Sequence, residues 1–507
     1  MVQNILDYLE ATAADCPDKP AFEDLEHSYT FAQVLGNAKR IGSALIHVLP
    51  QNAPVPVLME KEAWTLNVFM GAVCAGCFYT LVEPEQPDER IRTILDTLEA
   101  EVIVTSGKLS ERVAALGFTG KVLLAEELVE SVIDEEALAS RRKMACDIDP
   151  LYAIFTSGST GVPKGVVVSH RSVIDFTEHF TRIFGFSRED VIGNQAPFDF
   201  DVSVKDIYTS IFTGAKLVLI PKQMFSMPPS LLDFLCEKHV TSLTWAVSAL
   251  CMVTTLRGFE YRVPSEVRRV LFSGEVMPYK HLKAWREALP AAEFVNLYGP
   301  TEIVCNCTYY RVRGDEPEDA ALPIGSAFGN RLVFLLDDQN CVIRDAGIQG
   351  EICVAGTSLA SGYYNNPQAT EKSFVQNPEN QSYPQVIYRT GDIGTYNDEG
   401  LLCFAGRRDF QVKRMGHRIE LEEIQLTLDQ TEGVTRSCCI YGEQEQKLVA
   451  FYVGEIDKKE LRRKVKEQMP AFMLPDKFLH MDEMPMTKNG KIDRAALWNH
   501  YREEKRR

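Results

Sequence analysis

The chain has 507 residues, of which 45% are apolar and 25% charged, and this composition excludes the disordered, collagen-like and disulfide-scaffold classes. Because one compact core rarely grows beyond about 250–300 residues, we expect at least two domains. The net charge of −17 argues against non-specific binding to nucleic acid, which requires a basic surface.

Thirteen cysteines, an odd number, are scattered along the chain. The sequence has no apolar run of transmembrane length, and its N-terminus lacks a signal-peptide pattern, so we expect a cytoplasmic protein with reduced thiols. Cys74 and Cys77 form a Cys-x-x-Cys pair within an apolar run of small residues. We interpret this pair, and the pairs at 305/307 and 438/439, as buried thiols rather than metal ligands.

Short β-rich runs alternate with longer helical patterns in the first part of the chain. We predict strands at Val102–Thr105, Leu151–Phe155, Leu217–Ile220 and Val270–Phe272, and helices at Pro229–His239 and Tyr279–Leu289. This alternation predicts an α/β fold with parallel, layered sheets. The segment Phe328–Ala355 is richer in strands and turns, which is typical of a small barrel-like lobe.

The pattern changes after Arg407. We predict a helix carrying Leu421, Ile424 and Leu428, strands at 438–441 and 448–453, and a basic helix over 458–469, which together make an α+β domain of ordinary size. Residues 409–507 contain 19 Lys and Arg against 18 Asp and Glu, so almost all the negative charge lies before them. This shift predicts a boundary between domains 1–408 and 409–507. The basic stretch 458–464 is either a solvated helix face or a docking site for an acidic partner.

A loop rich in glycine and hydroxyl side chains, Ile154–Gly165, follows a predicted strand. Its glycines allow close backbone approach, its hydroxyls can donate to phosphate oxygens, and Lys164 adds a positive charge. The spacing differs from the Walker pattern of P-loop NTPases. Taken alone, the segment could equally be a flexible polar loop.

Further motifs occur in order along the chain. We expect turns at Asn296–Glu302, at Tyr388–Asp392 and at Gly406–Asp409, and the last motif is Pro485–Arg494 near the end. Together with the loop they resemble the adenylate-forming superfamily, and within it the amino-acid adenylation domains of nonribosomal peptide synthetases. The resemblance runs from Tyr29 to Arg494. Segments 194–208, 271–278 and 406–413 look most like the stand-alone D-alanine:carrier-protein ligases.

The resemblance implies two half-reactions. A carboxylate attacks the α-phosphorus of ATP and pyrophosphate leaves; the acyl adenylate is then attacked by the phosphopantetheine thiol of a carrier protein. Such phosphoryl transfer depends on alignment and charge neutralisation. The implied fold is a large N-terminal domain of layered α/β subdomains with a small barrel-like lobe, plus a small C-terminal α+β domain on a hinge.

The same resemblance implies roles for individual residues. Thr156, Ser157, Gly158, Ser159, Thr160 and Lys164 would hold the β- and γ-phosphates. Glu302 would hold Mg²⁺, and Thr301 would contact the α-phosphate. Tyr298 would stack on adenine and Asn296 would contact the amino edge of that base. Gly274 would belong to the same nucleotide site, and Asp392 with Arg407 would bind the ribose. Lys491 would bridge the attacking carboxylate and the α-phosphate, Asp409 would be the hinge, and Gly416 would line the thiol channel.

Asp201 matches the family aspartate that pairs with the α-ammonium of an amino acid; the alternative is a helix N-terminal acid. The other implied pocket residues are Val202, Lys205, Thr244, Leu271, Ser273, Leu297, Cys305 and Asn306. Ser273 and Lys205 depart from the D-alanine ligases, which have a cysteine and an apolar residue there. The pattern of Val202, Leu271, Ser273 and Leu297 resembles serine-activating domains, although tryptophan is usual at the position of Lys205.

Lys205 lies four residues after Asp201, so on a helix the two could pair. Otherwise a desolvated ammonium requires an anion, which an acidic substrate side chain would supply. We expect a small polar α-amino acid: serine-like first, aspartate or glutamate second, D-alanine third.

Two other functions are weighed against this one. An acyl- or aryl-CoA ligase of the same superfamily is disfavoured by Asp201, and a binding protein that has lost catalysis is disfavoured by Lys491, Glu302 and Asp392. The chain ends 13 residues after Arg494 without a carrier-like segment, so we expect a monomeric ligase whose carrier protein acts in trans.

Overall fold

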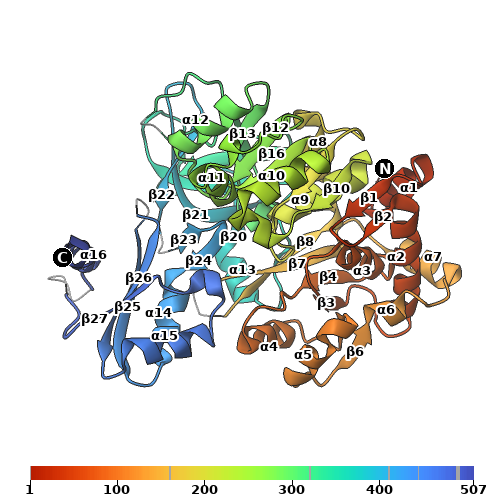
Figure 1. Cartoon of the computed structure of the whole chain (residues 1–507), viewed down its shortest axis with the longest axis horizontal. Coiled ribbons are helices and arrows are strands. Elements are labelled where there is room, and N and C mark those ends of the chain that lie inside the picture. Colours follow the sequence, from red (N-terminus) through yellow and green to blue (C-terminus); the bar gives the residue numbers. More distant parts are fainter. Residues whose placement is uncertain are drawn as a thin grey trace. The chain divides into compact units, whose positions relative to one another are not determined.

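The computed structural model describes residues 2–158, 162–318, 321–408, 411–442, 445–486 and 492–506 (Figure 1). Its contacts divide the chain into two compact units. The larger unit comprises Met1–Pro84, Thr97–Ile154 and Gly165–Arg408, and the smaller comprises Glu85–Asp96, Phe155–Lys164 and Asp409–Arg507. The smaller unit thus includes two short segments from earlier in the chain, and the domain boundary expected from charge stays a prediction.

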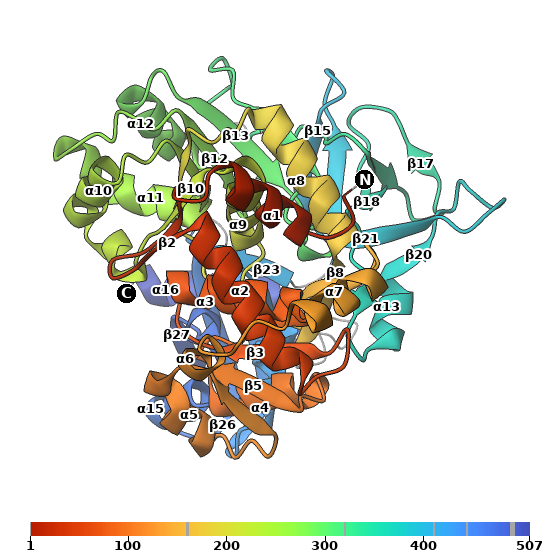
Figure 2. The same cartoon turned by 90° about the vertical axis from the view of Figure 1, so that its right-hand side faces the viewer.

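The larger unit contains a nine-stranded sheet whose central strands are parallel (Figures 1 and 2). In spatial order its strands are β15 (Ser326–Ala327), β14 (Thr308–Arg311), β13 (Glu293–Tyr298), β12 (Arg269–Ser273), β11 (Ser242–Ala246), β9 (Val191–Asn194), β10 (Lys216–Leu219), β1 (Pro20–Glu23) and β2 (Ser28–Thr30). The predicted strands at 217–220 and 270–272 are confirmed within one residue. The carboxyl ends of β11, β12 and β13 lie side by side.

A second sheet has seven strands, six of which come from residues 54–169 and one, β19, from much later in the chain. Its spatial order is β19 (Gly362–Tyr363), β8 (Lys164–Ser169), β7 (Pro150–Thr156), β4 (Phe78–Leu81), β3 (Pro54–Leu58), β5 (Val102–Thr105) and β6 (Lys121–Leu124). All four residues of β4 and of β5 are buried, as expected for parallel strands covered on both faces. The loop between β7 and β8 is the glycine- and hydroxyl-rich segment.

The helices of the larger unit supply amphipathic faces to these sheets. They are α1 (Leu6–Asp15), α2 (Phe31–Ile46), α3 (Ala63–Cys74), α5 (Ser110–Ala115), α6 (Ala125–Leu128), α7 (Glu135–Met144), α8 (His170–Phe184), α9 (Val202–Thr213), α10 (Pro228–Glu237), α11 (Val247–Thr255), α12 (Tyr279–Ala288) and α13 (Pro367–Ser373). The predicted helices at 229–239 and 279–289 are α10 and α12. Thr30 and Gln33 form a capping box that starts α2. No helix in the described ranges is long and apolar enough to cross a membrane.

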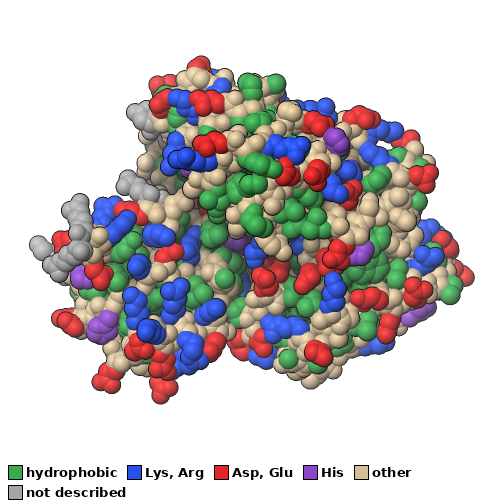
Figure 3. All heavy atoms as spheres, in the orientation of Figure 1, with side chains coloured by type: hydrophobic (Ala, Val, Ile, Leu, Met, Phe, Trp, Pro, Cys, Tyr) green, Lys and Arg blue, Asp and Glu red, His purple; other side chains and the backbone are tan. Residues whose placement is uncertain are grey.

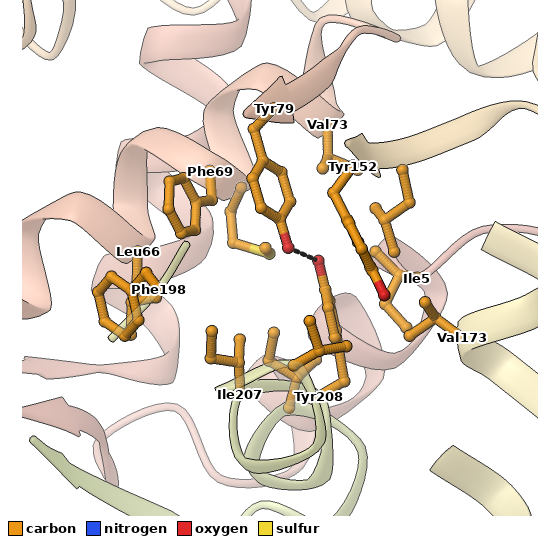
Figure 4. Close-up of a cluster of buried hydrophobic side chains, with 14 of the residues drawn as sticks. Ile5, Leu66, Phe69, Val73, Tyr79, Tyr152, Val173, Phe198, Ile207 and Tyr208 are labelled. Atoms are coloured by element: carbon orange, nitrogen blue, oxygen red, sulfur yellow. Dashed lines mark hydrogen bonds between the residues drawn. The ribbon is translucent and has the colours of Figure 1, made fainter. Parts of the chain in front are cut away.

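A buried aromatic cluster joins α3, α9 and the seven-stranded sheet (Figure 4). The ring of Phe69 stacks on Tyr79 with centroids 4.1 Å apart, and the hydroxyls of Tyr79 and Tyr208 are 2.8 Å apart. Tyr208 belongs to α9, so this contact anchors the helix that begins immediately after Asp201. Burial of several aromatic rings stabilises this part of the core.

The third sheet of the larger unit is antiparallel and forms the predicted small lobe. Its strands are β17 (Val342–Ile343), β16 (Arg331–Leu336), β18 (Gly350–Gly356), β21 (Val386–Tyr396), β20 (Phe374–Gln376) and β22 (Leu402–Arg407). The expectation that Tyr388–Asp392 and Gly406–Arg407 lie in turns is wrong. Both lie in strands, with Asp392 opposite Arg407, because alternating burial sustains β21 for eleven residues.

The smaller unit has the α+β composition predicted for the C-terminal region. Its strands are β23 (Gln411–Arg414), β24 (His417–Glu420), β25 (Val434–Gly442), β26 (Lys447–Gly454) and β27 (Lys477–His480), and its helices are α14 (Leu421–Gln430), α15 (Lys458–Lys466) and α16 (Arg494–Arg506), joined by α4 (Asp88–Thr97) from earlier in the chain. Helix α15 exposes Lys458, Lys459, Arg462, Arg463 and Lys466, and Lys and Arg side chains gather there in Figure 3. The basic stretch is therefore a solvent-facing helix side.

Candidate functional site

The implied amino-acid pocket begins at the carboxyl ends of three parallel strands. Thr244 in β11 is in register with Leu271 in β12, and Ser273 ends β12. Leu297 lies near the end of β13, the next strand. All four side chains are at most 5% exposed. Ligands of open α/β sheets bind at such strand ends. The pocket role of these four residues stays a prediction.

Asp201 is the residue immediately before α9, and it is 6% exposed. It has a right-handed helical backbone, and its side chain makes no capping hydrogen bond to the helix. Asp201 therefore stands at a helix N-terminus, as the alternative role requires, but its side chain does not cap the helix. The backbone carbonyl of Asp201 accepts a hydrogen bond from Cys305 Sγ at 3.0 Å, which brings the start of α9 against the connection that follows β13.

The connection from β13 to β14 has an unusual backbone. Val304 and Cys305 have φ angles of 56° and 62°, a left-handed conformation that is strained for a β-branched residue such as valine. A Cβ on Gly299 would lie 2.5 Å from the Cα of Asn306, so only glycine fits there. These two features fold the connection back on itself and place Cys305 and Asn306 beside α9.

Lys205 is buried in the first turns of α9, and its Nζ donates to Asn306 Oδ1 at 3.0 Å. Burial lowers the pKa of Lys205, although the charges of Cys305, Asp206 and Asp201 oppose this shift. The structure therefore unites five predicted pocket positions: Asp201, Val202, Lys205, Cys305 and Asn306. Lys205 is hydrogen-bonded to a neutral amide.

A buried polar network next to this pocket was missed by the sequence analysis. Asp206 accepts hydrogen bonds from Asn194 Nδ2 at 2.8 Å and from the hydroxyl of Thr244, one of the implied pocket residues. Burial raises the pKa of Asp206 to about 6 and lowers that of Lys61 to about 7. Lys61 Nζ donates to the carbonyl of Gln195 at 3.0 Å. The sequence signal for this network was Asp206, which directly follows Lys205 in a helix with no other charged residue.

The predicted nucleotide residues Tyr298, Asp392 and Arg407 come together at the end of β13 and the paired strands β21 and β22. Tyr298 donates its hydroxyl to Asp392 Oδ2 at 2.5 Å, and Arg407 pairs with the other carboxylate oxygen. Burial first and then the Asp392 charge raise the pKa of Tyr298 well above its usual value. Asn296 lies two residues before Tyr298 in β13. Its Nδ2 donates to the carbonyl of Pro323 at 2.9 Å, which orients its amide.

Glu302 and Thr301 lie in the short 3-10 helix after β13, and Glu302 is 1% exposed. Tyr363 donates its hydroxyl to Glu302 Oε1 at 2.8 Å. The described residues contain no group of three or more metal-ligating side chains. A single buried carboxylate fits Mg²⁺, which is usually bound by one or two carboxylates together with substrate phosphates.

The glycine-rich loop is held by residues of the smaller unit. Ser157 donates its hydroxyl to the carbonyl of Arg418 at 2.7 Å, and the N–H of Gly158 donates to Glu423 Oε2 at 3.2 Å. Thr156 ends β7 and Lys164 begins β8. Four predicted site residues lie outside the described residues: Ser159, Thr160, Asp409 and Lys491.

Two predicted glycines occupy backbone positions that favour glycine. Gly274, directly after β12, has a φ of 99°. Gly416 has a φ of 82° and forms, with Met415, the two-residue turn between β23 and β24. Both residues therefore have a structural reason for their identity, and their nucleotide and thiol-channel roles stay predictions.

The fold and these motifs together define an adenylate-forming protein, and comparison with known proteins agrees. Residues 9–364 match the family model described as AMP-binding enzyme, and residues 423–491 match the AMP-binding enzyme C-terminal domain. The chain belongs to this family: it is an adenylation domain of the adenylate-forming superfamily and an AMP-forming ligase.

The relatives differ greatly in length. D-alanine--D-alanyl carrier protein ligase of Bacillus velezensis is 32% identical over 511 residues, covering 97% of this chain and 98% of that protein. Surfactin synthase subunit 1 of Bacillus subtilis is 31% identical over 504 residues, covering 98% of this chain and 14% of that protein. The chain thus spans a small part of the length of that synthase.

Solved structures share the fold at low identity. The adenylation domain AlmE of Vibrio cholerae, in complex with glycyl-adenosine-5'-phosphate, has a TM-score of 0.86 and 22% identity, covering 99% of this chain and 98% of that one. An artificially fused adenylation–PCP di-domain from Klebsiella oxytoca has a TM-score of 0.81 and 21% identity, covering 94% of each chain.

Proposed function

We propose that this ligase activates a small polar α-amino acid with ATP and Mg²⁺ and transfers the aminoacyl group to the phosphopantetheine thiol of a separate carrier protein. The observation that carries the proposal is the buried Asp201, whose side chain does not cap its helix and which lies beside the other predicted pocket residues. The relatives named as carrier protein ligase and peptide synthases support the carrier.

In this mechanism Asp201 binds the α-ammonium of the substrate, because a buried carboxylate is most stable when paired with a cation. Tyr298, Asp392 and Arg407 orient the ribose and base, and the loop that begins at Thr156 holds the phosphates. Glu302 would hold Mg²⁺, which neutralises phosphate charge when bound. Lys491 would stabilise the charge that develops between the attacking carboxylate and the α-phosphate.

The surroundings of Lys205 support an acidic side chain on the substrate. Its ammonium is buried and its hydrogen bond runs to a neutral amide, whereas the Asp206 carboxylate accepts from Asn194 and Thr244. Once Asp201 pairs with the substrate ammonium, a substrate carboxylate would compensate the charge of Lys205. The burial of Lys205 thus moves the acidic amino acids ahead of serine, which the sequence ranked first on Val202, Leu271, Ser273 and Leu297. D-alanine stays the third candidate.

The test is ATP–pyrophosphate exchange with each of the twenty amino acids and D-alanine, on wild type and on Lys205→Met, which retains most of the side-chain volume. Exchange with aspartate or glutamate that is lost in the variant would establish Lys205 as the reader of the side chain. Exchange with serine that persists in the variant would make Lys205 structural. Lys222→Met, at an exposed position, is the matched control.

The acceptor is tested separately from adenylation. With the amino acid found by exchange, thioester formation is measured with phosphopantetheinylated carrier proteins and with free coenzyme A. Loading of a carrier supports the proposal. Efficient thioester formation with coenzyme A and none with any carrier would favour the CoA-ligase alternative, and best exchange with a large apolar amino acid would contradict the proposed pocket.

A further inference from the structure

A buried ion pair in the smaller unit lies directly against the glycine-rich loop. Arg90 of α4 and Glu423 of α14 are joined by a contact of 2.8 Å between NH1 and Oε1, and both side chains are at most 8% exposed. The second oxygen of Glu423 accepts the Gly158 N–H at 3.2 Å. One carboxylate therefore bridges a guanidinium and a loop amide.

Arg90 has more donors than this carboxylate satisfies. Its Nε is buried and has no hydrogen-bond partner within the part of the chain that the structure describes. Burial raises the pKa of Glu423, because desolvation outweighs the stabilisation by Arg90 and the Gly158 N–H. A carboxylate thus occupies a site that has an unused donor, and its charged form is costly there.

The donors around Glu423 have the character of a phosphate site. A guanidinium offers a planar set of N–H groups that matches phosphate oxygens, and glycine-loop N–H groups bind such anions. A phosphate group carries more acceptor oxygens than a carboxylate, so it could also satisfy Arg90 Nε. The neighbouring loop donor, the Ser157 hydroxyl, is likewise bound by the segment that leads into α14, through the Arg418 carbonyl.

We propose that Arg90 and the Gly158 N–H form a subsite for the polyphosphate of ATP or for free pyrophosphate, and that Glu423 is an internal carboxylate that fills this subsite when no phosphate is bound. The inference rests on the proposed adenylation activity. It assigns opposite roles to the two members of one ion pair: Arg90 binds the phosphate, and Glu423 competes with it.

Opposite roles give a clear test in ATP–pyrophosphate exchange. We expect Glu423→Gln to lower the KM for ATP and Arg90→Gln to raise it, each by about tenfold, the effect of one charge-assisted hydrogen bond. The KM for the amino acid should not change. An ion pair that only holds the fold together would shift both values in the same direction or leave them unchanged, and either result would overturn the inference.

The controls separate this inference from folding and from the proposed function. Arg92→Gln removes an exposed arginine of the same helix, and it should leave the KM values unchanged. If the Arg90→Gln variant does not fold, the variants Arg90→Lys and Glu423→Asp are measured instead. We then expect the same opposite shifts in the KM for ATP, but smaller ones. Inorganic pyrophosphate titrated into the full chain by calorimetry distinguishes the two phosphate sources. Absence of exchange in wild type with every amino acid would refute the proposed function instead.

Discussion

The amino-acid pocket and the glycine-rich loop differ in how their polar groups are satisfied. In the pocket, Lys205 donates to Asn306 and Asp206 accepts from Thr244, so neutral side chains of the same buried core satisfy the charged groups. In the loop, the Ser157 hydroxyl and the Gly158 N–H are bound by Arg418 and Glu423, more than 260 residues later. The predicted amino-acid pocket is therefore held by contacts within the core, whereas the donors of the predicted phosphate loop are held by a distant part of the chain.

The physical reason is the kind of backbone that carries each group. Pocket residues lie on strand ends and on a helix anchored by the Tyr79–Tyr208 contact. Rigid elements with buried side chains hold a geometry that is ready for a ligand. The donors of a loop between two strands pair with the acceptors nearest to them. A bound phosphate could therefore replace these acceptors at modest cost.

The largest expected effect is on the phosphate side. Lys491→Ala should lower the exchange rate by about 10²–10³-fold, because the variant loses a positive charge at the transition state. If the pocket and the loop act separately, the KM for the amino acid stays within about twofold of the wild-type value. The measurement is steady-state exchange with Lys477→Ala, an exposed position, as control. A large change in the KM for the amino acid would link Lys491 to the pocket and contradict separate recognition of the amino acid and the phosphates.

A change in the pocket should have the complementary effect. Asp201→Asn keeps the side-chain shape but removes the charge that pairs with the substrate ammonium, and should reduce kcat/KM for the amino acid by about 10²-fold. The loss should appear mainly in the KM for the amino acid, and the KM for ATP should be unchanged. Asp18→Asn, at an exposed site, serves as control. Equal loss in both KM values would contradict separate recognition.

The smallest effect concerns the stability of the two units. Burial lowers the pKa of His170 to about 4, and its Nδ1 accepts the Ile5 N–H at 3.2 Å. A depressed histidine pKa means that the unfolded chain binds the proton first, at its ordinary value near 6.5. Stability from this group is therefore present above pH 6.5 and falls as the pH drops toward 4, by about 2 kcal/mol at pH 5.

Hydrogen exchange at pH 7 and pH 5, corrected for intrinsic rates, would resolve this loss. We expect amides around α1 and α8 of the larger unit to lose protection, whereas the smaller unit has no buried histidine among its described residues and should change less. His170→Gln should remove the pH dependence at α1. Persistence of the full pH effect in this variant would show that another group is responsible.

Much of the fold follows from local patterns. Periodicity predicted the strands near 102–105 and 270–272 and helix α12. The ordered motifs also led to Asp201, Lys205 and Asn306, which the structure brings together. These features are readable because each depends on neighbouring residues or on a fixed motif.

The parts that were missed depend on long-range contacts. Asp206 and Thr244 lie 38 positions apart, and Arg90 and Glu423 lie 333 apart. A single sequence does not show which buried charges meet, because burial and pairing are set by tertiary packing. The same is true of Tyr388–Asp392, where we expected a turn but pairing with β22 sustains a strand.

The backbone between β13 and β14 has a consequence for redesign of specificity. Glu302 and Asn306 lie four positions apart, with the left-handed Val304 and Cys305 between them and Gly299 packed on Asn306. A new side chain at 305 or 306 must be accommodated by the same tight segment that presents Glu302. Residues 299–307 are therefore better exchanged as one cassette from a donor ligase than one position at a time.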